Sequence, residues 1–392
     1  MTTIDMHQDI RDAVTRLCTG FPGEYWRRLD EARAYPSEFV TALTEQGYLA
    51  ALIPEEYGGN GLGLSAATAI LEEIHRAGCN AAACHAQMYT MGTLLRHGSA
   101  EQKRRYLPGI AEGTLRLQAF GVTEPTSGTN TAALKTFARK EGDRYIVNGQ
   151  KIWTSRAEYS DLMILLARTT PVAEVAKPTE GLSVFILDMR DAVKKGLRIA
   201  PIRTMMNHAT CEVFFDDVEV PIANLVGEEN RGWTYAKYLL AHERTNIADV
   251  NRAKRELERL KRIARAEGLW DDPRFRDQIA LLEVDIVALE MLVLRVLSAE
   301  RGGKQALDVA GLLKIRGSEI QQRYTELMML ACGPFGVPFI QEAMEAGWQG
   351  DHVGAAHCAT ATAGYLNYRK TTIYGGSNEV QRNIVAQTVL GS

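Results

Sequence analysis

The stretch FGVTEPTSGTN at residues 120–130 lies where the sequence changes from helical to strand-like patterning, and it decides the fold class. Before it, residues 1 to about 117 follow the period of amphipathic helices. After it, residues 118–222 form short β-branched or aromatic runs that are separated by turn residues. The helical period returns at 223 and continues almost to the end. Helices on both sides of one β segment, without an alternating βαβ series, predict an α+β chain that is mainly α.

This pattern predicts three domains. We expect an N-terminal α-helical domain at 1–117, a central β-domain at 118–222 and a C-terminal helical bundle at 223–392. A chain of 392 residues is usually too long for a single hydrophobic core, which agrees with the division.

Local signals place the main elements. An apolar stripe at 65–78 predicts a helix, and 101–107 predicts a short helix that ends at Pro108. Asn148 and Gly149 separate two strand-like runs, at 145–147 and 151–154, and predict a hairpin turn. Further strands are expected at 162–167, 182–187 and 213–220, and long helices at 232–268, 274–301 and 307–332.

Composition excludes several classes of protein. Lys and Arg number 45 against 48 Asp and Glu, so the net charge is −3 and nucleic acid is not an expected partner. The longest apolar region, 279–297, contains four charged residues, and a membrane span needs about 20 nearly uncharged ones. Acidic residues within 1–16 do not fit a signal peptide. We therefore expect a cytoplasmic chain with no membrane span.

The cysteines and histidines show no metal-binding spacing. Six cysteines without a C-x-x-C pair indicate reduced, mostly buried thiols, and no metal site is expected. His75, His85 and His97, and likewise His352 and His357, are not spaced to share a helical face, so surface or hydrogen-bonded histidines are expected. The glycine-rich stretch 58–63 lacks the spacing of a phosphate-binding loop and is interpreted as a turn between helices.

Two segments of the β region could contact a ligand. The hydroxyls, Gly and Pro of 120–130 form a turn that can hydrogen-bond a heteroaromatic ring or a phosphate, although a plain capping turn is an alternative. The stretch NGQKIWTS at 148–155 delivers an indole and two hydroxyls, and a core tryptophan is the alternative there.

Two segments of the bundle region carry further candidates. Ala236, Leu240, Glu243, Ile247 and Val250 recur at helical spacing, which puts Glu243 on the apolar stripe of its helix. Burial raises the pKa of a carboxylate toward the range of a general base, but a structural glutamate paired with arginine fits the spacing equally well. The stretch IYGGSNEVQR at 373–382 places a Gly-Gly turn before a helix, whose free N–H groups could meet a polar cofactor.

Together with IPEEYGG at 53–59, these four segments resemble the acyl-CoA dehydrogenase family along essentially the whole chain. The shared motifs are Thr-Glu-Pro followed by Gly, Asn-Gly-x-Lys-x-Trp, Glu-Arg-x-x-x-Ala and a late Gly-Gly-x-x-Glu. The resemblance implies an N-terminal helical domain, a central antiparallel β-domain and a C-terminal four-helix bundle, with FAD between the last two. It also implies oxidation of an acyl-CoA thioester to a trans-2-enoyl-CoA, with the electrons passed to an electron-transferring flavoprotein.

The resemblance assigns roles to individual residues. Most members carry the catalytic Glu just before the glycine of the late turn, where this chain has Gly375. A second group, which includes isovaleryl-CoA and long-chain acyl-CoA dehydrogenases, uses the Glu of Glu-Arg-x-x-x-Ala, so Glu243 is the implied base. The backbone N–H of Gly375 and a flavin ribityl hydroxyl would polarise the thioester carbonyl. The implied substrate contacts are Thr129, Arg244 and Gly376, and the implied flavin contacts are Phe120, Val122, Thr123, Gly128, Thr129, Trp153, Ser155, Ser377 and Glu379.

Some motifs depart from the family. Its Arg-x-x-Phe-Gly, which reaches FAD in a neighbouring subunit, is replaced near 270–277, where Arg274 or Arg276 could substitute. Its Gly-Gly-x-Gly reads CGPFG at 332–336, and Asn130 replaces an Asp. The resemblance implies a homodimer or homotetramer, and the departures leave a hetero-oligomer open. A flavin oxidase, monooxygenase or desulfinase on the same fold, or a partner subunit of a hetero-oligomeric dehydrogenase, also stay open.

Overall fold

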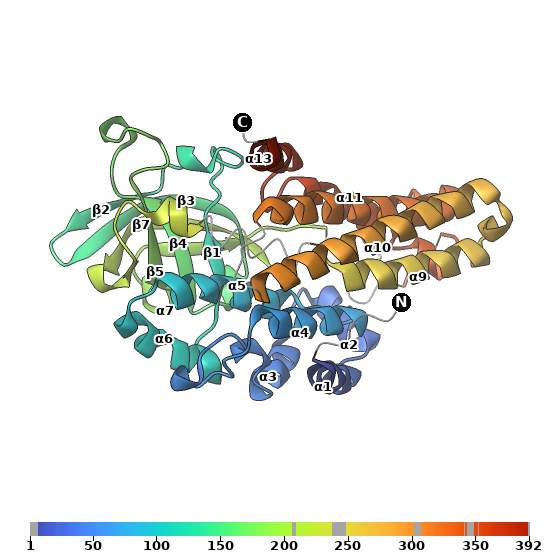
Figure 1. Ribbon diagram of the computed structural model, residues 1–392, viewed down its shortest axis with the longest axis horizontal. Helices are drawn as coiled ribbons and strands as arrows, with labels where there is room; N and C mark the ends of the chain where they lie inside the picture. Colours follow the sequence, from blue (N-terminus) through green and yellow to red (C-terminus); the bar gives the residue numbers. More distant parts are fainter. Residues whose placement is uncertain are drawn as a thin grey trace. The chain divides into compact units, whose positions relative to one another are not determined.

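The computed structural model describes residues 7–205, 209–236, 248–301, 307–340, 342, 349–351 and 353–390 (Figure 1). The chain divides into two compact units, which are described separately. The sheet unit comprises Tyr35–Ala67 and Ala81–His242, and the bundle unit comprises Met1–Ala34, Thr68–Asn80 and Glu243–Ser392. The three domain ranges expected from the sequence stay a prediction.

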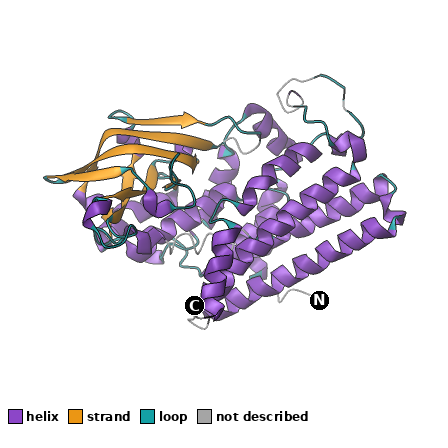
Figure 2. Ribbon diagram, turned by 90° about the horizontal axis from the view of Figure 1, so that it is seen from above, coloured by secondary structure: helices purple, strands orange, loops and turns teal. Residues whose placement is uncertain are grey.

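The sheet unit is organised around an eight-stranded sheet (Figure 2). Neighbouring strands follow the order β6-β7-β3-β2-β4-β5-β8, and β1 pairs with β4. Most pairings are antiparallel, but β1 and β2 each pair with β4 in parallel. The strands are β1 (Leu117–Gly121), β2 (Phe137–Glu141), β3 (Arg144–Ser155), β4 (Leu162–Arg168), β5 (Leu182–Asp188), β6 (Leu197–Pro201), β7 (Thr210–Pro221) and β8 (Leu225–Val226). The strands expected at 162–167, 182–187 and 213–220 are thus confirmed as β4, β5 and β7.

The expected hairpin at Asn148–Gly149 is wrong, because β3 runs through both residues. The strand pairs on one edge with β2 and on the other with β7, and the β7 register shifts between Val147 and Gly149. Gly149 has φ +145, so its lack of a side chain serves a bulge rather than a turn. The actual hairpin turn lies at 142–143, between Glu141 of β2 and Arg144 of β3.

Apolar residues alternate between the two faces of β4 and β5. Leu162, Ile164 and Leu166 join one buried cluster, while Met163 and Leu165 join another. The first cluster also contains residues of α5 (Ala82–His97) and α6 (Ala100–Glu112), so these helices cover that face. A strand that is buried on both sides needs a continuous apolar run, which is the sequence of β4.

Helix α6 continues past Pro108, so its expected end at that residue is wrong. Ser99 caps the helix through a reciprocal capping box with Gln102. Beyond the proline, Ile110 is completely buried, and this packing outweighs the single backbone hydrogen bond that a proline removes. The sheet unit also contains α3 (Ser37–Glu45) and α7 (Met189–Ala192), and α4 (Leu64–Arg76) begins in this unit and ends in the bundle unit.

Long helices form the bundle unit (Figure 2). Helices α9 (Val250–Ala266), α10 (Pro273–Arg301) and α11 (Leu307–Ala331) pack on one another around one apolar cluster. The helix expected at 232–268 is not continuous in the described residues, because Asp249 has φ +48 just before α9. The remaining helices are α1 (Gln8–Thr19), α2 (Gly23–Ala32), α12 (Ala361–Tyr368) and α13 (Asn378–Leu390). Among the described helices, none is long and apolar enough to cross a membrane.

Candidate active site

A buried carboxylate organises the turn that follows β1. Glu124 accepts hydrogen bonds from the backbone N–H of Lys135 at 2.6 Å and of Thr136 at 2.9 Å. It also pairs with Lys151 of β3, whose Nζ lies 2.8 Å from the carboxylate. Three charge-assisted bonds on one carboxylate fix the turn on the sheet.

Lys151 completes this internal pair, and its side chain is 0% exposed. Its ammonium also donates to the carbonyl of Val122 at 3.0 Å. Burial lowers the pKa of Lys151 to about 8, and the Glu124 carboxylate only partly opposes this effect. Burial alone would raise the pKa of Glu124, but the charge of Lys151 and the hydrogen bonds hold it below its ordinary value.

Trp153 lies two residues beyond Lys151 and is turned out of the sheet. Its side chain is 57% exposed, and its backbone has φ +61, which is uncommon for a residue other than glycine. The β3–β7 register shifts between Lys151 and Thr154, so the local bulge accommodates this conformation. Next to it, the Ile152 N–H donates to the carbonyl of Thr123 at 2.8 Å, which joins the turn to the strand.

The structure therefore brings the two predicted β segments together. Gly128 and Thr129 are exposed on the turn, where a Cβ at Gly128 would meet no atom within 4 Å. At the far end of β3, Ser155 is half-buried and pairs in register with Thr210. Phe120, Val122 and Thr123 are half-buried.

The late turn belongs to the bundle unit. Gly375 has φ +65, a left-handed conformation that costs about 1–2 kcal/mol for other residues. Gly376 is exposed, Ser377 is half-buried, and its hydroxyl accepts from the Val380 N–H at 3.4 Å at the start of α13. The next residue, Asn378, is buried and anchors the turn, since its Oδ1 accepts from Lys314 Nζ of α11 at 2.8 Å.

Other predicted residues fall elsewhere. Glu379 is exposed in the first turn of α13, and hydrogen bonds from its own backbone N–H and from Ser377 hold its pKa below the ordinary value. Arg274 and Arg276 are both exposed at the start of α10. Glu243 and Arg244 lie outside the described residues.

Three sequence profiles of one family match the chain in order. The N-terminal domain of acyl-CoA dehydrogenases matches residues 5–114, the middle domain 119–218 and the C-terminal domain 230–390. The chain belongs to the acyl-CoA dehydrogenase family. Members of the acyl-CoA dehydrogenase family are FAD-dependent oxidoreductases, so this chain dehydrogenates acyl-CoA thioesters and uses FAD.

Known acyl-CoA dehydrogenases agree with this assignment. The chain is 32% identical over 365 residues to acyl-CoA dehydrogenase FadE26 of Mycobacterium tuberculosis, covering 90% of this chain and 87% of the relative. A solved structure named Tcur3481-Tcur3483 steroid ACAD is 29% identical with a TM-score of 0.84, covering 98% of this chain and 97% of the other. The ChsE4-ChsE5 complex from Mycobacterium tuberculosis gives 28% identity and a TM-score of 0.82, covering 100% and 98%.

The residues of the sheet unit fit the flavin that an acyl-CoA dehydrogenase uses. An exposed indole at Trp153 can lie against an aromatic ring, and the adjoining turn offers the Thr129 hydroxyl over open space at Gly128. Lys151 is buried against Glu124, so its charge is directed into the sheet. The exposed indole and hydroxyl are thus groups of the kind that can stack on and hydrogen-bond a flavin.

Sequence reasoning missed two features of the fold. The Glu124–Lys151 pair joins two recognised motifs, and the signal was a charged residue inside each otherwise apolar or hydroxyl-rich stretch. The second feature brings Cys332 near His357 and Cys358, although their spacing along the chain predicts no metal site. All six cysteines are buried free thiols, as expected.

Proposed function

We propose that this chain oxidises an acyl-CoA to a trans-2-enoyl-CoA with Glu243 as the catalytic base. The observation that carries the proposal is the identity of two residues. Glu243 occupies the glutamate position of Glu-Arg-x-x-x-Ala, and Gly375 occupies the position where other members carry the base. The backbone of Gly375 is left-handed, a conformation that favours glycine, which supports a base at another position.

The proposal gives the chain's own groups distinct roles. Glu243 accepts the α-proton, and Arg244 orients its carboxylate and contacts the substrate. The backbone N–H of Gly375 donates to the thioester carbonyl, which stabilises the negative charge that develops on that oxygen. Thr129 and Gly376 contact the substrate.

The proposed flavin contacts are those that the sequence motifs imply: Phe120, Val122, Thr123, Gly128, Thr129, Trp153, Ser155, Ser377 and Glu379. When bound, FAD supplies the acceptor for the β-hydride of the substrate. The rigid base of the turn at Glu124 supports the contacts from that turn, because pre-organised contacts orient a cofactor without further loss of entropy.

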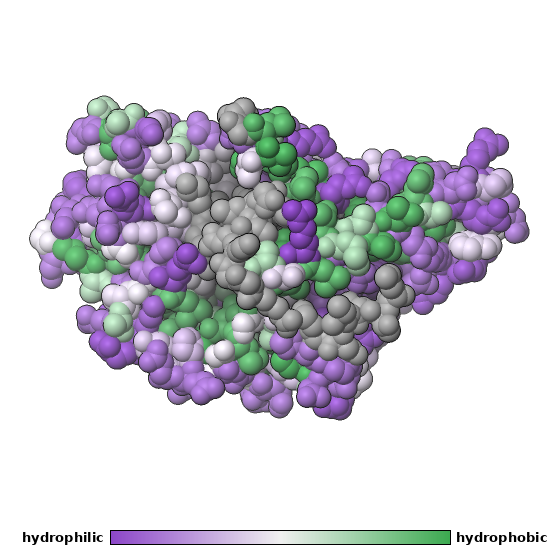
Figure 3. Space-filling view, in the orientation of Figure 1, coloured by the Kyte–Doolittle hydropathy of each residue, from purple (hydrophilic) through white to green (hydrophobic). Residues whose placement is uncertain are grey.

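We also propose an electron-transferring flavoprotein as the electron acceptor, and a homodimer or homotetramer that buries an apolar face of the bundle unit. Along α10, Leu281, Val284, Val287 and Met291 are 49–66% exposed, and their spacing puts them on one side of the helix. Figure 3 shows hydrophobic surface over the long helices. The related ChsE4-ChsE5 complex contains two chains of different names, so an unlike partner is the alternative occupant. A cytoplasmic location stays a prediction.

The decisive experiment compares Glu243→Gln with wild type and with Glu258→Gln, a matched change at an exposed position of α9. Each protein is purified with its flavin, and the anaerobic bleaching of the flavin absorbance is followed over a panel of straight, branched and ring-containing acyl-CoA thioesters. We expect Glu243→Gln to keep its flavin and to slow bleaching by about 10²–10⁴-fold, since a general base contributes roughly that much. Glu258→Gln should bleach at the wild-type rate.

Other outcomes distinguish the alternatives. Bleaching of Glu243→Gln at near wild-type rate would move the base elsewhere, with Glu379 as the next carboxylate to test. A wild-type protein that holds FAD but is bleached by no thioester would indicate a partner subunit. Rapid reoxidation of the reduced, product-bound enzyme by oxygen would indicate an oxidase.

A further inference from the structure

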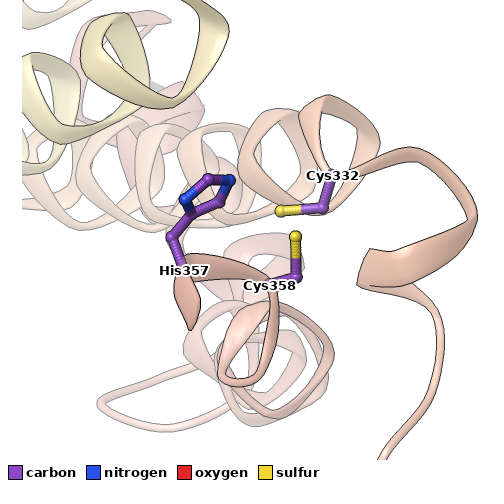
Figure 4. A group of neighbouring side chains, drawn as sticks. All are labelled: Cys332, His357 and Cys358. Atoms are coloured by element: carbon purple, nitrogen blue, oxygen red, sulfur yellow. The ribbon is translucent and has the colours of Figure 1, made fainter. Parts of the chain in front are cut away.

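Three sulfur and nitrogen ligands converge in the bundle unit, and none of them belongs to a candidate flavin or substrate contact. Cys332 follows the end of α11, and His357 and Cys358 lie on the 3₁₀ turn η10 (Ala356–Cys358) (Figure 4). One potential ligand atom from each residue lies within 4.8 Å of the other two. Both thiols are buried, at 2% and 1% exposure.

We propose that Cys332, His357 and Cys358 bind a thiophilic divalent cation of the zinc class. Thiolate and imidazole are the ligands that zinc prefers, and four-coordinate sites with two cysteines and a histidine are common. Bonds of about 2.3 Å to sulfur and 2.0–2.1 Å to nitrogen require ligand atoms roughly 3.6–3.8 Å apart in a tetrahedron. Because the present separations are within 4.8 Å, a contraction of at most about 1 Å meets that requirement, which side-chain rotation can supply.

A carboxylate completes the site. Glu267, the residue after α9, has its Oε1 2.6 Å from Nε2 of His357. A carboxylate next to a metal-bound imidazole fixes the tautomer and raises the basicity of the ring, and it can also occupy an open coordination position. The Glu267 carboxylate and the two thiolates together carry three negative charges, one more than a divalent ion neutralises. The guanidinium of Arg259, which is near Cys332, offsets the remaining charge.

The burial pattern provides a path for the ion. The side chains of His357 and Glu267 are 26% and 27% exposed, whereas both thiols are inside. A cation from solvent therefore meets the imidazole and the carboxylate before it reaches the sulfurs. Binding requires both cysteines as thiolates.

The site would join three segments: the ends of α9 and α11, and η10. It would thus stabilise the C-terminal part of the bundle unit rather than take part in dehydrogenation. Cys332 begins the stretch CGPFG, which departs from the family's Gly-Gly-x-Gly.

Cobalt and zinc titrations test the proposal on untagged, reduced holoprotein that has been treated with a chelator. Anaerobic Co²⁺ should give thiolate-to-cobalt charge-transfer bands that saturate at one equivalent per chain, and Zn²⁺ should abolish them. Cys358→Ser should remove the bands. Glu267→Gln should weaken zinc binding by about 10–100-fold, as loss of such a carboxylate does in other sites. The matched control is Cys211→Ser, a buried thiol of the sheet unit, which should leave the bands unchanged.

The wild-type titration decides the matter even if a cysteine variant fails to fold. Absence of charge-transfer bands in folded, reduced wild type overturns the proposal. Formation of a Cys332–Cys358 disulfide in the presence of stoichiometric zinc under mild oxidant also overturns it, because a bound ion would protect both thiolates. Bands that survive Cys358→Ser would place the cobalt elsewhere and have the same consequence.

Discussion

The Glu124–Lys151 pair should be the most sensitive point of the sheet unit. In Glu124→Gln, the ammonium of Lys151 loses its counter-charge while its side chain is 0% exposed. Removing one partner of a buried ion pair costs about 3–5 kcal/mol. The new amide cannot accept from the N–H groups of both Lys135 and Thr136 as the carboxylate does, and an unsatisfied buried N–H adds about 1–3 kcal/mol. We expect a loss of about 4 kcal/mol or more, which is a large fraction of an ordinary domain's stability.

The loss should depend on pH. Wild-type Lys151 has a pKa of about 8, already lowered by burial. Removal of the carboxylate eliminates the group that opposes burial, so the pKa of Lys151 in the variant falls further. In the unfolded chain, Lys151 keeps its proton up to its ordinary pKa of about 10.4. Folding of the variant therefore releases a proton at every pH between its lowered pKa and about 10.4, and the stability of the variant rises with pH across that range. The difference between variant and wild type should therefore be largest below the lowered pKa of the variant, should shrink as the pH rises toward 8, and should stay constant above it.

Hydrogen exchange during urea unfolding of the full chain measures this effect on peptides within 118–155. The matched control is Glu219→Gln, which removes an exposed ion pair with Arg144 in the same sheet and should leave exchange unchanged. A double-mutant cycle with Lys151→Met isolates the pair, and the double variant should be less destabilised than the sum of the single ones. Equal exchange in Glu124→Gln and Glu219→Gln would refute the reasoning, as would a loss independent of pH.

Three further results are expected. Burial would raise the pKa of Asp249, but Arg252 and His75 outweigh it and lower this pKa to about 2. The shift contributes about 2 kcal/mol to the free energy of unfolding above pH 4, and this contribution is lost as the pH falls toward 2. In Asp249→Asn, the free energy of unfolding should therefore depend less on pH between 4 and 2. Asn378→Ala removes an acceptor for buried Lys314, so it should destabilise the bundle unit by about 1–3 kcal/mol in thermal unfolding and weaken flavin retention. The control Asn367→Ala, at a half-buried position, should destabilise the protein much less. Val287→Asp should lower the mass in light scattering if α10 lies in a subunit interface, and Val172→Asp, at 48% exposure against 49%, should not.

Local patterns were sufficient for the strands that are buried on both faces and for the long helices α10 and α11. The run at 162–167 became β4 because a continuous apolar stretch has no polar side to expose. The turn predicted at Asn148–Gly149 was wrong because the Asn-Gly signal is local, whereas hydrogen bonding to β2 on one edge and β7 on the other holds these residues in a strand. Pro108 misled for the same reason, since packing of Ile110 lies beyond the reach of the local rule.

Contacts between distant segments account for what could not be predicted. Glu124 and Lys151 are 27 residues apart, and each is an ordinary charge until the fold removes both from water. Cys332 and His357 are 25 residues apart in the sequence and near one another in the fold, so no motif spacing could have revealed them. The position of Glu243 on its apolar stripe falls outside the described residues, and its role stays a prediction.

Different segments are proposed to bind the flavin and to accept the substrate proton. The turn at 122–130 owes its rigidity to an internal pair that lies inside the sheet and carries no group to the surface, while Trp153 and Thr129 remain free to contact a cofactor. The proposed base lies in another segment, Glu-Arg-x-x-x-Ala. Glu124→Gln should therefore lower flavin content and stability together, whereas Glu243→Gln should lower turnover alone. If both variants lost flavin in proportion to stability, the two tasks would be coupled, and Glu243 would be a structural carboxylate rather than the base.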